Sequence, residues 1–400
     1  MLLTNATDID GALIDVRIEG ETIEAVAGAG SLAAADGERT VDLSGRLLTP
    51  AFAEPHAHLD KAFLAERIVN PTGDLVGAIM AMHASRDLIT FEDTIERAER
   101  AARLMVANGA TLIRSHADTT LENGLMSVEA LCEVRRRIAD ICDLQIVALV
   151  SWPVTGAAGA SARSLLRDAL AAGADLVGGC PHLDTDVHAA NDVLLEIASE
   201  FGRDVDLHTD ETLNPDILGL ADLARRVTVS GFEHRVTASH CVSLGMQPAA
   251  VQLQVAESVA EAGISVVALP HTNLFLQGRD QQCAMPRALT AVSALRAAGA
   301  TVCAGADNLQ DPFNPVGRGD PLETAGLMIM AAHLLPRAAY ESVSVEVVHA
   351  VTGHRPTLAV GERADLVAIR ATAERDAIAF GTADRIVIHR GRLVSGSAHA

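Results

Sequence analysis

Several absences narrow the classes of protein to which this sequence of 400 residues can belong. No apolar run approaches the ~18 residues of a membrane-spanning helix, and the first residues carry no basic segment typical of a secretory signal. The six cysteines form no C-x-x-C pair, which favours reduced, mostly buried thiols. A net charge of −21 opposes binding to nucleic acid or to an anionic membrane surface. We therefore expect a soluble, cytoplasmic protein.

What the sequence does contain is a His-x-His pair, His56 and His58, which follows a short apolar segment at 46–52. Side chains of a strand alternate between its faces, so both imidazoles point to one side and can bind one divalent metal ion. The pair alone is weak evidence of a metal site. It gains weight because His208, His240 and Asp307 each close a further short apolar or small-residue run.

The spacing of these five residues predicts the fold. His56 and Asp307 are 251 positions apart, and a (β/α)8 barrel takes roughly 250 residues. His208 and His240 are 32 positions apart, about one strand–helix unit of such a barrel. The candidate ligands then fall at the ends of strands one, five, six and eight. In this fold the carboxyl ends of the strands form the active site.

Segments that suit the remaining strands lie between the candidate ligands, at 110–116, 144–151, 174–180 and 264–270. Helical patterns separate them, such as 91–108, which ends on Asn108-Gly109. This alternation predicts a parallel sheet. Residues 1–50 and 355–400 instead hold short alternating segments, typical of antiparallel strands. We therefore expect a (β/α)8 TIM barrel at 51–354 and a small β-sandwich domain formed by both termini.

The scarcity of lysine bears on the number of metal ions. Of 31 basic residues only Lys61 is a lysine, and it lies just past strand one. Some barrel hydrolases hold two metals bridged by a carbamylated lysine on the fourth strand, which has no lysine here. The sequence therefore predicts one metal ion.

Several segments resemble the amidohydrolase superfamily, and within it the cytosine deaminase group. They are residues 54–60, 206–211, 236–240, 276–279, 311–317 and, near the end, 361–367. The resemblance implies one divalent ion, Zn²⁺ or Fe²⁺, bound by His56, His58, His208 and Asp307. It also implies Glu211 as the proton shuttle and His240 as a partner of the metal-bound water.

These roles are chemically consistent. A bound divalent ion lowers the pKa of water from ~15.7 toward ~7, and Asp307 can both ligate the ion and take the water proton. Glu211, three residues after His208, can protonate a ring nitrogen while hydroxide attacks the adjacent carbon. His240 can stabilise the charge on the attacking oxygen. The expected reaction is loss of ammonia or a substituted amine from a small nitrogen heterocycle.

Three departures from the cytosine deaminase pattern concern substrate recognition. The usual glutamine after strand three is missing from the segment that holds Ser151 and Trp152. Asn308 stands where the group has a second aspartate, and Phe313 where it has a tryptophan. The sequence therefore predicts a substrate other than cytosine. The candidate substrate-binding residues are Trp152, Ser151, Asn308, Gln277, Phe313 and Lys61.

Some interpretations stay open at this stage. Trp152 can stack on a flat substrate or pack in the core, and Lys61 can bind a substrate carboxylate or pair with an acid. His116 and His182 can contact the substrate or form structural hydrogen bonds. The alternative reaction is hydrolysis of a cyclic or linear amide, and the alternative class is a non-catalytic barrel that binds a small molecule. We expect a small-molecule substrate and a homo-oligomer.

Overall fold

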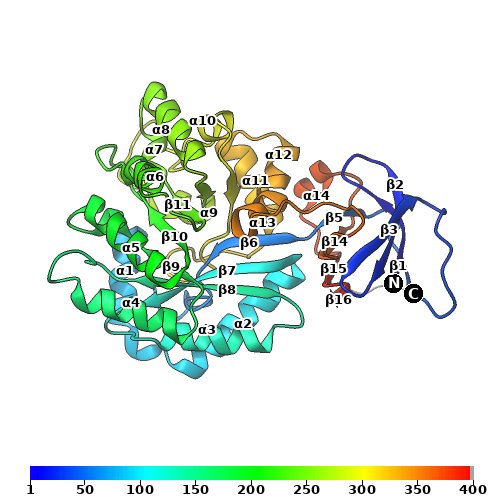
Figure 1. The fold of residues 1–400 in the computed structure, drawn as a ribbon, viewed down its shortest axis with the longest axis horizontal. Helices are drawn as coiled ribbons and strands as arrows, with labels where there is room; N and C mark the ends of the chain where they lie inside the picture. Colours follow the sequence, from blue (N-terminus) through cyan, green and yellow to red (C-terminus); the bar gives the residue numbers. More distant parts are fainter. Residues whose placement is uncertain (397–400) are drawn as a thin grey trace.

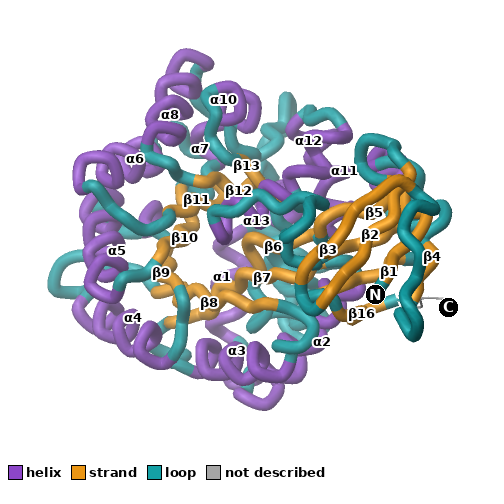
Figure 2. The backbone as a smooth tube through the Cα atoms, turned by 45° about the vertical axis from the view of Figure 1, so that its right-hand side comes forward, coloured by secondary structure: helices purple, strands orange, loops and turns teal. Residues whose placement is uncertain are grey.

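The computed structural model describes residues 1–396, and its largest element is a nearly closed barrel of eight parallel strands (Figures 1 and 2). Each strand pairs with the next one in the chain, and a bridge between Ala57 and Asp307 joins the last strand to the first. This arrangement confirms the predicted barrel. Its strands are β6 (Phe52–Ala57), β7 (Ala110–Thr119), β8 (Asp143–Val150), β9 (Leu176–Gly179), β10 (Asp204–Thr209), β11 (Val236–His240), β12 (Ser265–Ala268) and β13 (Val302–Ala304).

Helices surround the barrel and connect its strands (Figure 2). They are α1 (Leu75–Ala84), α2 (Phe91–Ala107), α3 (Met126–Arg137), α4 (Ala160–Ala172), α5 (Val187–Phe201), α6 (Gly219–Ser230), α7 (Val242–Gly245), α8 (Ala249–Glu261), α9 (Pro270–Leu276), α10 (Val292–Ala297), α11 (Pro321–Ala332), α12 (Pro336–Ser342) and α13 (Val345–Thr352). Two short 3₁₀ turns cover Arg86–Leu88 and Pro181–Leu183. Within residues 1–396, no helix has the length and apolar character needed to cross a bilayer.

Helix α2 shows how local sequence sets these boundaries. The Thr90 side chain accepts a hydrogen bond from the Asp93 amide and so caps the first turn. The helix ends before Asn108-Gly109, as its sequence predicts. Gly109 has a φ of +99°, and a Cβ there would lie 2.9 Å from the Phe52 ring. Glycine is therefore required where α2 turns into β7 beside the first barrel strand.

A second sheet, separate from the barrel, combines both ends of the chain (Figure 1). Its strand order is β16-β15-β14-β5-β1-β2-β3, with β4 paired to β1. Most pairs are antiparallel, as expected, but β1 pairs in parallel with β4 and β5. Helix α14 (Glu374–Phe380) belongs to the same C-terminal part of the chain. The strands are β1 (Leu2–Thr7), β2 (Leu13–Glu19), β3 (Thr22–Gly28), β4 (Thr40–Asp42), β5 (Leu47–Pro50), β14 (Leu366–Ile369), β15 (Arg385–His389) and β16 (Arg392–Ser395).

The apolar segment at 46–52, expected to be the first barrel strand, is divided between the two sheets. Residues Leu47–Pro50 form β5 of the small sheet and pair with β14, whereas the barrel strand β6 starts at Phe52. The division cannot be read from the sequence, because both halves are buried and apolar. As a result His56 lies within β6 and His58 lies just beyond its end.

Candidate metal centre

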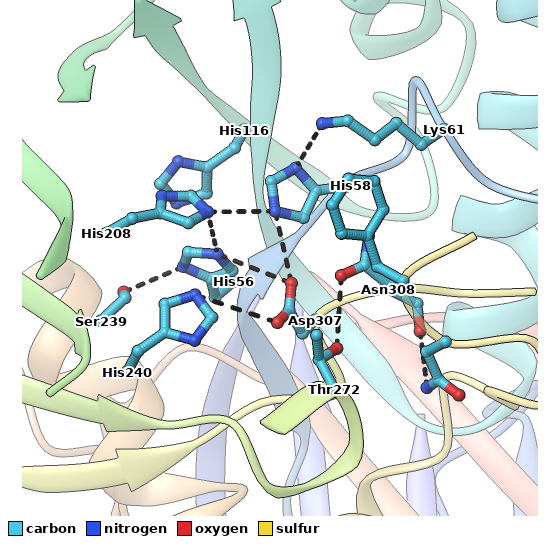
Figure 3. Close-up of polar contacts among 12 residues, drawn as sticks. His56, His58, Lys61, His116, His208, Ser239, His240, Thr272, Asp307 and Asn308 are labelled. Carbon is cyan, nitrogen blue, oxygen red and sulfur yellow. Dashed lines mark hydrogen bonds and ion pairs between the residues drawn. The ribbon is translucent and has the colours of Figure 1, made fainter. Parts of the chain in front are cut away.

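Four potential ligand atoms converge at the carboxyl end of the barrel (Figure 3). Nε2 of His208 lies 3.2 Å from Nε2 of His56 and 3.2 Å from Nε2 of His58. Asp307 Oδ1 lies 3.3 Å from His58 Nε2 and 3.8 Å from His56 Nε2. Residues that are up to 251 positions apart in the chain therefore present three nitrogens and one carboxylate oxygen to one small volume.

The chemistry of this cluster fits a divalent cation. Both carboxylate oxygens of Asp307 are buried and lack a hydrogen-bond partner within the described residues. A buried carboxylate without donors is costly, and a cation relieves that cost. Burial holds the pKa of His56, His58 and His208 well below the usual value, so these imidazoles are neutral and offer lone pairs. Imidazole nitrogen with carboxylate oxygen is a donor set typical of zinc and iron sites.

His116 lies next to this cluster without completing it. Its ring centroid is 3.9 Å from that of His56, and its Nε2 is 3.6 Å from Asp206 Oδ1. His116, His56 and His208 also form a group of three close nitrogens. However, the cavity beside the cluster is lined by His58, His208 and Asp307, whereas neither His56 nor His116 reaches its wall. A metal ion held by the Asp307 set would face that cavity.

Glu211 and His240 flank the cluster on the cavity side. Glu211 is 8% exposed, and its Oε1 lies 3.5 Å from His240 Nδ1. Burial raises the pKa of Glu211 well above its usual value, and the negative charge of Asp307 adds a smaller shift in the same direction. The carboxyl group is therefore suited to hold a proton at neutral pH and to donate it.

His240 has a defined orientation. Its Nδ1 lies 3.1 Å from Asn273 Oδ1, and because an amide oxygen only accepts, Nδ1 carries the proton of this hydrogen bond. Its Nε2 is buried without a partner in the described part of the chain and lies 4.0 Å from Asp307 Oδ2. Burial lowers the pKa of His240 to about 4. The free Nε2 therefore faces the place where a water bound next to Asp307 would lie.

A cavity of about 120 Å³ opens beside these groups. One wall is formed by His58, His208, Glu211, His240 and Asp307, the residues predicted to bind the metal and transfer protons. The remaining lining is largely apolar and includes both large aromatic side chains of the sequence prediction, Trp152 and Phe313. The arrangement can hold a flat, small molecule against a metal ion, with a proton donor at hand.

Comparison with known proteins agrees with this geometry. A model of the amidohydrolase family matches residues 66–395. The chain belongs to the amidohydrolase family. This confirms the resemblance found in the sequence, and it makes the protein an enzyme that hydrolyses carbon–nitrogen bonds other than peptide bonds. The alternative of a non-catalytic barrel is thereby removed. Amidohydrolases depend on a metal ion, in accordance with the His-rich site.

Individual relatives cover nearly the whole amidohydrolase chain. Pterin deaminase from Rhizobium rhizogenes is 34% identical over 364 residues, which span 89% of this chain and 82% of the relative. The structure of 5-methylcytosine deaminase from Klebsiella pneumoniae liganded with phosphonocytosine has 30% identity and a TM-score of 0.91, over 99% of this chain and 98% of its own. N-isopropylammelide isopropylaminohydrolase from Burkholderia multivorans has 30% identity and a TM-score of 0.83, with the same coverage.

Only some of the predicted substrate-binding residues lie at the cavity. Lys61, Trp152, Asn308 and Phe313 line the cavity, but Ser151 and Gln277 do not. Ser151 precedes Trp152 where the chain leaves β8, and neighbouring side chains of an extended segment point in opposite directions. Gln277 lies behind His240, because its Nε2 donates to the Asn273 oxygen that also meets His240.

Two lining residues are held by other side chains of the amidohydrolase. Lys61 Nζ donates to Asp118 Oδ1 over 2.7 Å, so of the two open interpretations the structure shows the ion pair. Burial lowers the pKa of Lys61, but Asp118 and Asp60 outweigh this and raise it overall. The amide of Asn308 accepts from Thr272 Oγ1 and donates to Asp311 Oδ2. Both groups are therefore fixed before any substrate arrives.

Sequence reasoning missed the contribution of helix α1. Leu75, Ile79, Met82 and His83 of this helix line the cavity. Although α1 is the first helix after β6, which carries His56, nothing in its own pattern marks these residues, because the helix is apolar on several sides. His182 has a structural position, since its Nδ1 lies 3.0 Å from the backbone oxygen of His208.

A buried chain of hydrogen bonds fixes the ligand His56. Ser239 Oγ donates to Asp206 Oδ1 over 2.8 Å and lies 2.9 Å from His56 Nδ1. The hydroxyl hydrogen is used on Asp206, so Ser239 accepts the Nδ1 proton of His56. The Nε2 of His56 then keeps its lone pair for a metal ion. Arg114 Nη1 donates to the other oxygen of Asp206 and holds this carboxylate in place.

We therefore expect Ser239→Ala to weaken metal binding by roughly 10- to 100-fold, a typical effect of removing a hydrogen bond that orients a metal-binding histidine. Competition with a chelator of known affinity measures the change. Ser258→Ala, on the outer helix α8, is the matched control and should bind metal as the unmodified protein does. If Ser239→Ala retains full affinity, the hydroxyl fills space without selecting the tautomer of His56.

Proposed function

We propose that this amidohydrolase removes ammonia or a substituted amine from a small amino-substituted nitrogen heterocycle, with one Zn²⁺ or Fe²⁺ ion held by His56, His58, His208 and Asp307. The observation that carries the proposal is the cavity in which three of these ligands, Glu211 and His240 face one small volume. The relatives support the choice of substrate class, because their names give a pterin, a 5-methylcytosine and an N-isopropylammelide as substrates.

The side chains divide the chemistry among them. A divalent ion bound here supplies an activated water near neutral pH. Asp307 Oδ2, which has no hydrogen-bond donor, would accept a proton from that water, and the unprotonated Nε2 of His240 would accept a hydrogen bond from it and so orient it. Glu211 donates its proton to a ring nitrogen, which makes the adjacent carbon more electrophilic. The hydroxide that remains would add to this carbon, and the carbon–nitrogen bond outside the ring would break as the amine takes the proton held by Asp307. The new hydroxyl group would return a proton to Glu211 and become the carbonyl of the product.

The walls of the cavity support a flat substrate. Trp152 and Phe313 offer aromatic faces, and Leu183, Ile79 and Met82 add apolar surface. Such a cavity excludes water around the reacting carbon and favours stacking of a planar ring.

Cytosine itself should be a poor substrate. We expect its kcat/KM to lie at least some hundredfold below that of the best ring and below about 10⁵ M⁻¹s⁻¹. The reason is that the glutamine and aspartate that usually pair with the pyrimidine edge are absent, and the Asn308 amide is already engaged by Thr272 and Asp311. Each missing hydrogen bond costs about 1–3 kcal/mol.

The measurement is ammonia release from a panel of pterin, 5-methylcytosine, cytosine and aminotriazines, with a cyclic amide as a probe of the alternative reaction. Release of ammonia from at least one ring supports deamination, whereas ring opening of the cyclic amide alone would favour amide hydrolysis. A kcat/KM for cytosine at or above about 10⁵ M⁻¹s⁻¹ would show that Asn308 and Phe313 do not decide specificity.

We also propose that the enzyme acts in the cytoplasm as a homo-oligomer and does not bind nucleic acid. The net charge of −21 supports the last point. Sedimentation analysis of the purified protein tests the assembly.

A further inference from the structure

The barrel has a weak seam between its first strand, β6, and its last strand, β13. Other neighbouring strands pair over several residues, as β11 does with β10 along its whole length. Within residues 1–396, β6 and β13 are instead joined by a single bridge, between Ala57 and Asp307. The proposed metal ligands His56 and Asp307 lie on opposite sides of this seam. Their spacing therefore depends on few hydrogen bonds between the two strands.

The side chain of Glu54 crosses this seam. Glu54 lies in β6 and is 4% exposed. Its Oε1 accepts a hydrogen bond from the His56 amide over 3.0 Å. Its Oε1 and Oε2 also lie 3.2 and 3.0 Å from the Ala306 amide, which donates to them. One carboxylate therefore binds the backbone of the ligand His56 and the residue directly before the ligand Asp307.

The backbone of Asp307 needs such support. Its φ is +61°, in the left-handed region that residues other than glycine rarely adopt. A conformation of this kind persists where the surrounding structure holds it. The hydrogen bonds from the Ala306 amide to Glu54 act directly before Asp307 in the chain. Their loss would let Asp307 relax and would move its Oδ1 relative to His56 Nε2, from which it is 3.8 Å away.

Glycine at position 305 leaves room for this carboxylate. A Cβ at Gly305 would lie 2.4 Å from Glu54 Oε1, closer than a carbon and an oxygen can pack. The same Cβ would lie 3.1 Å from Pro55 Cγ, so the Glu54 side chain could not simply move toward this proline. Gly305→Ala is therefore a way to displace the carboxylate without changing Glu54 itself.

We propose that Glu54 is a positioning residue that sets the spacing of the metal ligands His56 and Asp307. This inference rests on the proposed metal site. A carboxylate suits the role because both of its oxygens accept hydrogen bonds, and both partners here are N–H donors. If Glu54 only closed the barrel, its loss would lower the stability of the fold but leave the coordination of a bound ion unchanged.

The test uses Co²⁺ added to metal-depleted protein, because the visible absorption spectrum of bound Co²⁺ depends on the number and arrangement of its ligands. Glu54→Gln keeps the shape of the side chain but places an NH₂ donor where Glu54 has an acceptor. We expect an altered Co²⁺ spectrum and a roughly 10- to 100-fold lower affinity for Zn²⁺ in competition with a chelator. Gly305→Ala should also alter the spectrum, because its methyl group displaces the same carboxylate.

Glu346→Gln, on helix α13, is the matched control. Glu346 is also a buried glutamate, at 8% exposure, but its carboxylate accepts from the Arg355 guanidinium instead of the backbone of a metal ligand. The substitution should lower the melting temperature of the protein and leave the Co²⁺ spectrum and the Zn²⁺ affinity unchanged.

The outcomes separate this inference from the proposed function. If Glu54→Gln lowers only the melting temperature, Glu54 closes the barrel without setting the ligands, and the inference is wrong while the proposed function stands. A folded Gly305→Ala protein with an unchanged spectrum would overturn it as well.

If Glu54→Gln does not fold, Glu54→Asp takes its place. It keeps the carboxylate on a side chain one methylene shorter, which cannot reach both amides, so the spectrum should again change. If neither variant folds, the carboxylate is needed for the barrel itself and the inference is wrong. If the unmodified protein binds no Co²⁺, the proposed metal site fails and the inference fails with it.

Discussion

Glu211→Gln is expected to lower kcat by a factor of at least ~10², while the fold and the bound metal are retained. Glutamine has nearly the shape of glutamate, but it cannot release a proton to a ring nitrogen. The structure gives the reason for a large effect, since Glu211 is buried in the cavity wall, and this burial raises its pKa well above the usual value and so favours the protonated form. Glu211 Oε1 also lies 3.5 Å from His240 Nδ1, and both residues line the same cavity.

Two measurements check this prediction: steady-state turnover on the best ring and the metal content of the same preparation. Glu257→Gln, an exposed glutamate on helix α8, is the matched control and should keep full activity. If Glu211→Gln loses turnover only in proportion to lost metal, the residue is a ligand or a structural group. Retention of activity with metal bound would remove Glu211 from the mechanism altogether.

Removal of the metal is expected to abolish turnover, and one equivalent of Zn²⁺ or Fe²⁺ per chain should restore it. His56, His58, His208 and Asp307 present one set of close ligand atoms that faces the cavity. The fourth barrel strand, Leu176–Gly179, has no lysine that could bridge two ions. Without the ion the barrel also keeps the unpaired carboxylate of Asp307, so we expect a lower melting temperature of the metal-free protein.

Elemental analysis, titration of metal into chelator-treated protein and thermal unfolding measure these effects. His208→Ala should fail to recover activity with one equivalent of metal. His354→Ala is the matched control, because His354 is an exposed histidine whose Nε2 pairs with Glu362 away from the cavity. Two stoichiometric ions per active chain, or full activity without any, would contradict the single-ion site.

Much of the fold follows from local patterns. Most barrel strands are short and mainly apolar, helical segments separate them, and the ligand-type residues recur at multiples of one strand–helix unit. This periodicity is a property of neighbouring residues, so it survives without knowledge of the tertiary structure. The same holds for His56, His58, His208 and Asp307, because the carboxyl ends of barrel strands meet on one side whatever the details of packing.

Other features of the site depend on the path that the chain takes after each barrel strand ends and on the direction of the side chains there. Sequence alone included Ser151 and Gln277 among the substrate contacts, yet in the structure they lie outside the cavity wall. The sequence also gave helix α1 no role, although four of its side chains line the cavity. Loop geometry and helix docking decide these positions, and neither has a local signature.

By itself, then, the sequence predicted the barrel from the spacing of its segments and the family from the resemblance of its motifs, and both are confirmed. The metal ligands and the proton donor stay predictions, which the convergence of these side chains supports. Only the tertiary structure decided that Lys61 pairs with Asp118 and that Ser239 links His56 to Asp206. The physical reason is that these contacts join side chains 57 and 183 positions apart. Their pairing depends on the direction in which each side chain leaves the packed barrel, which no local pattern of residues specifies.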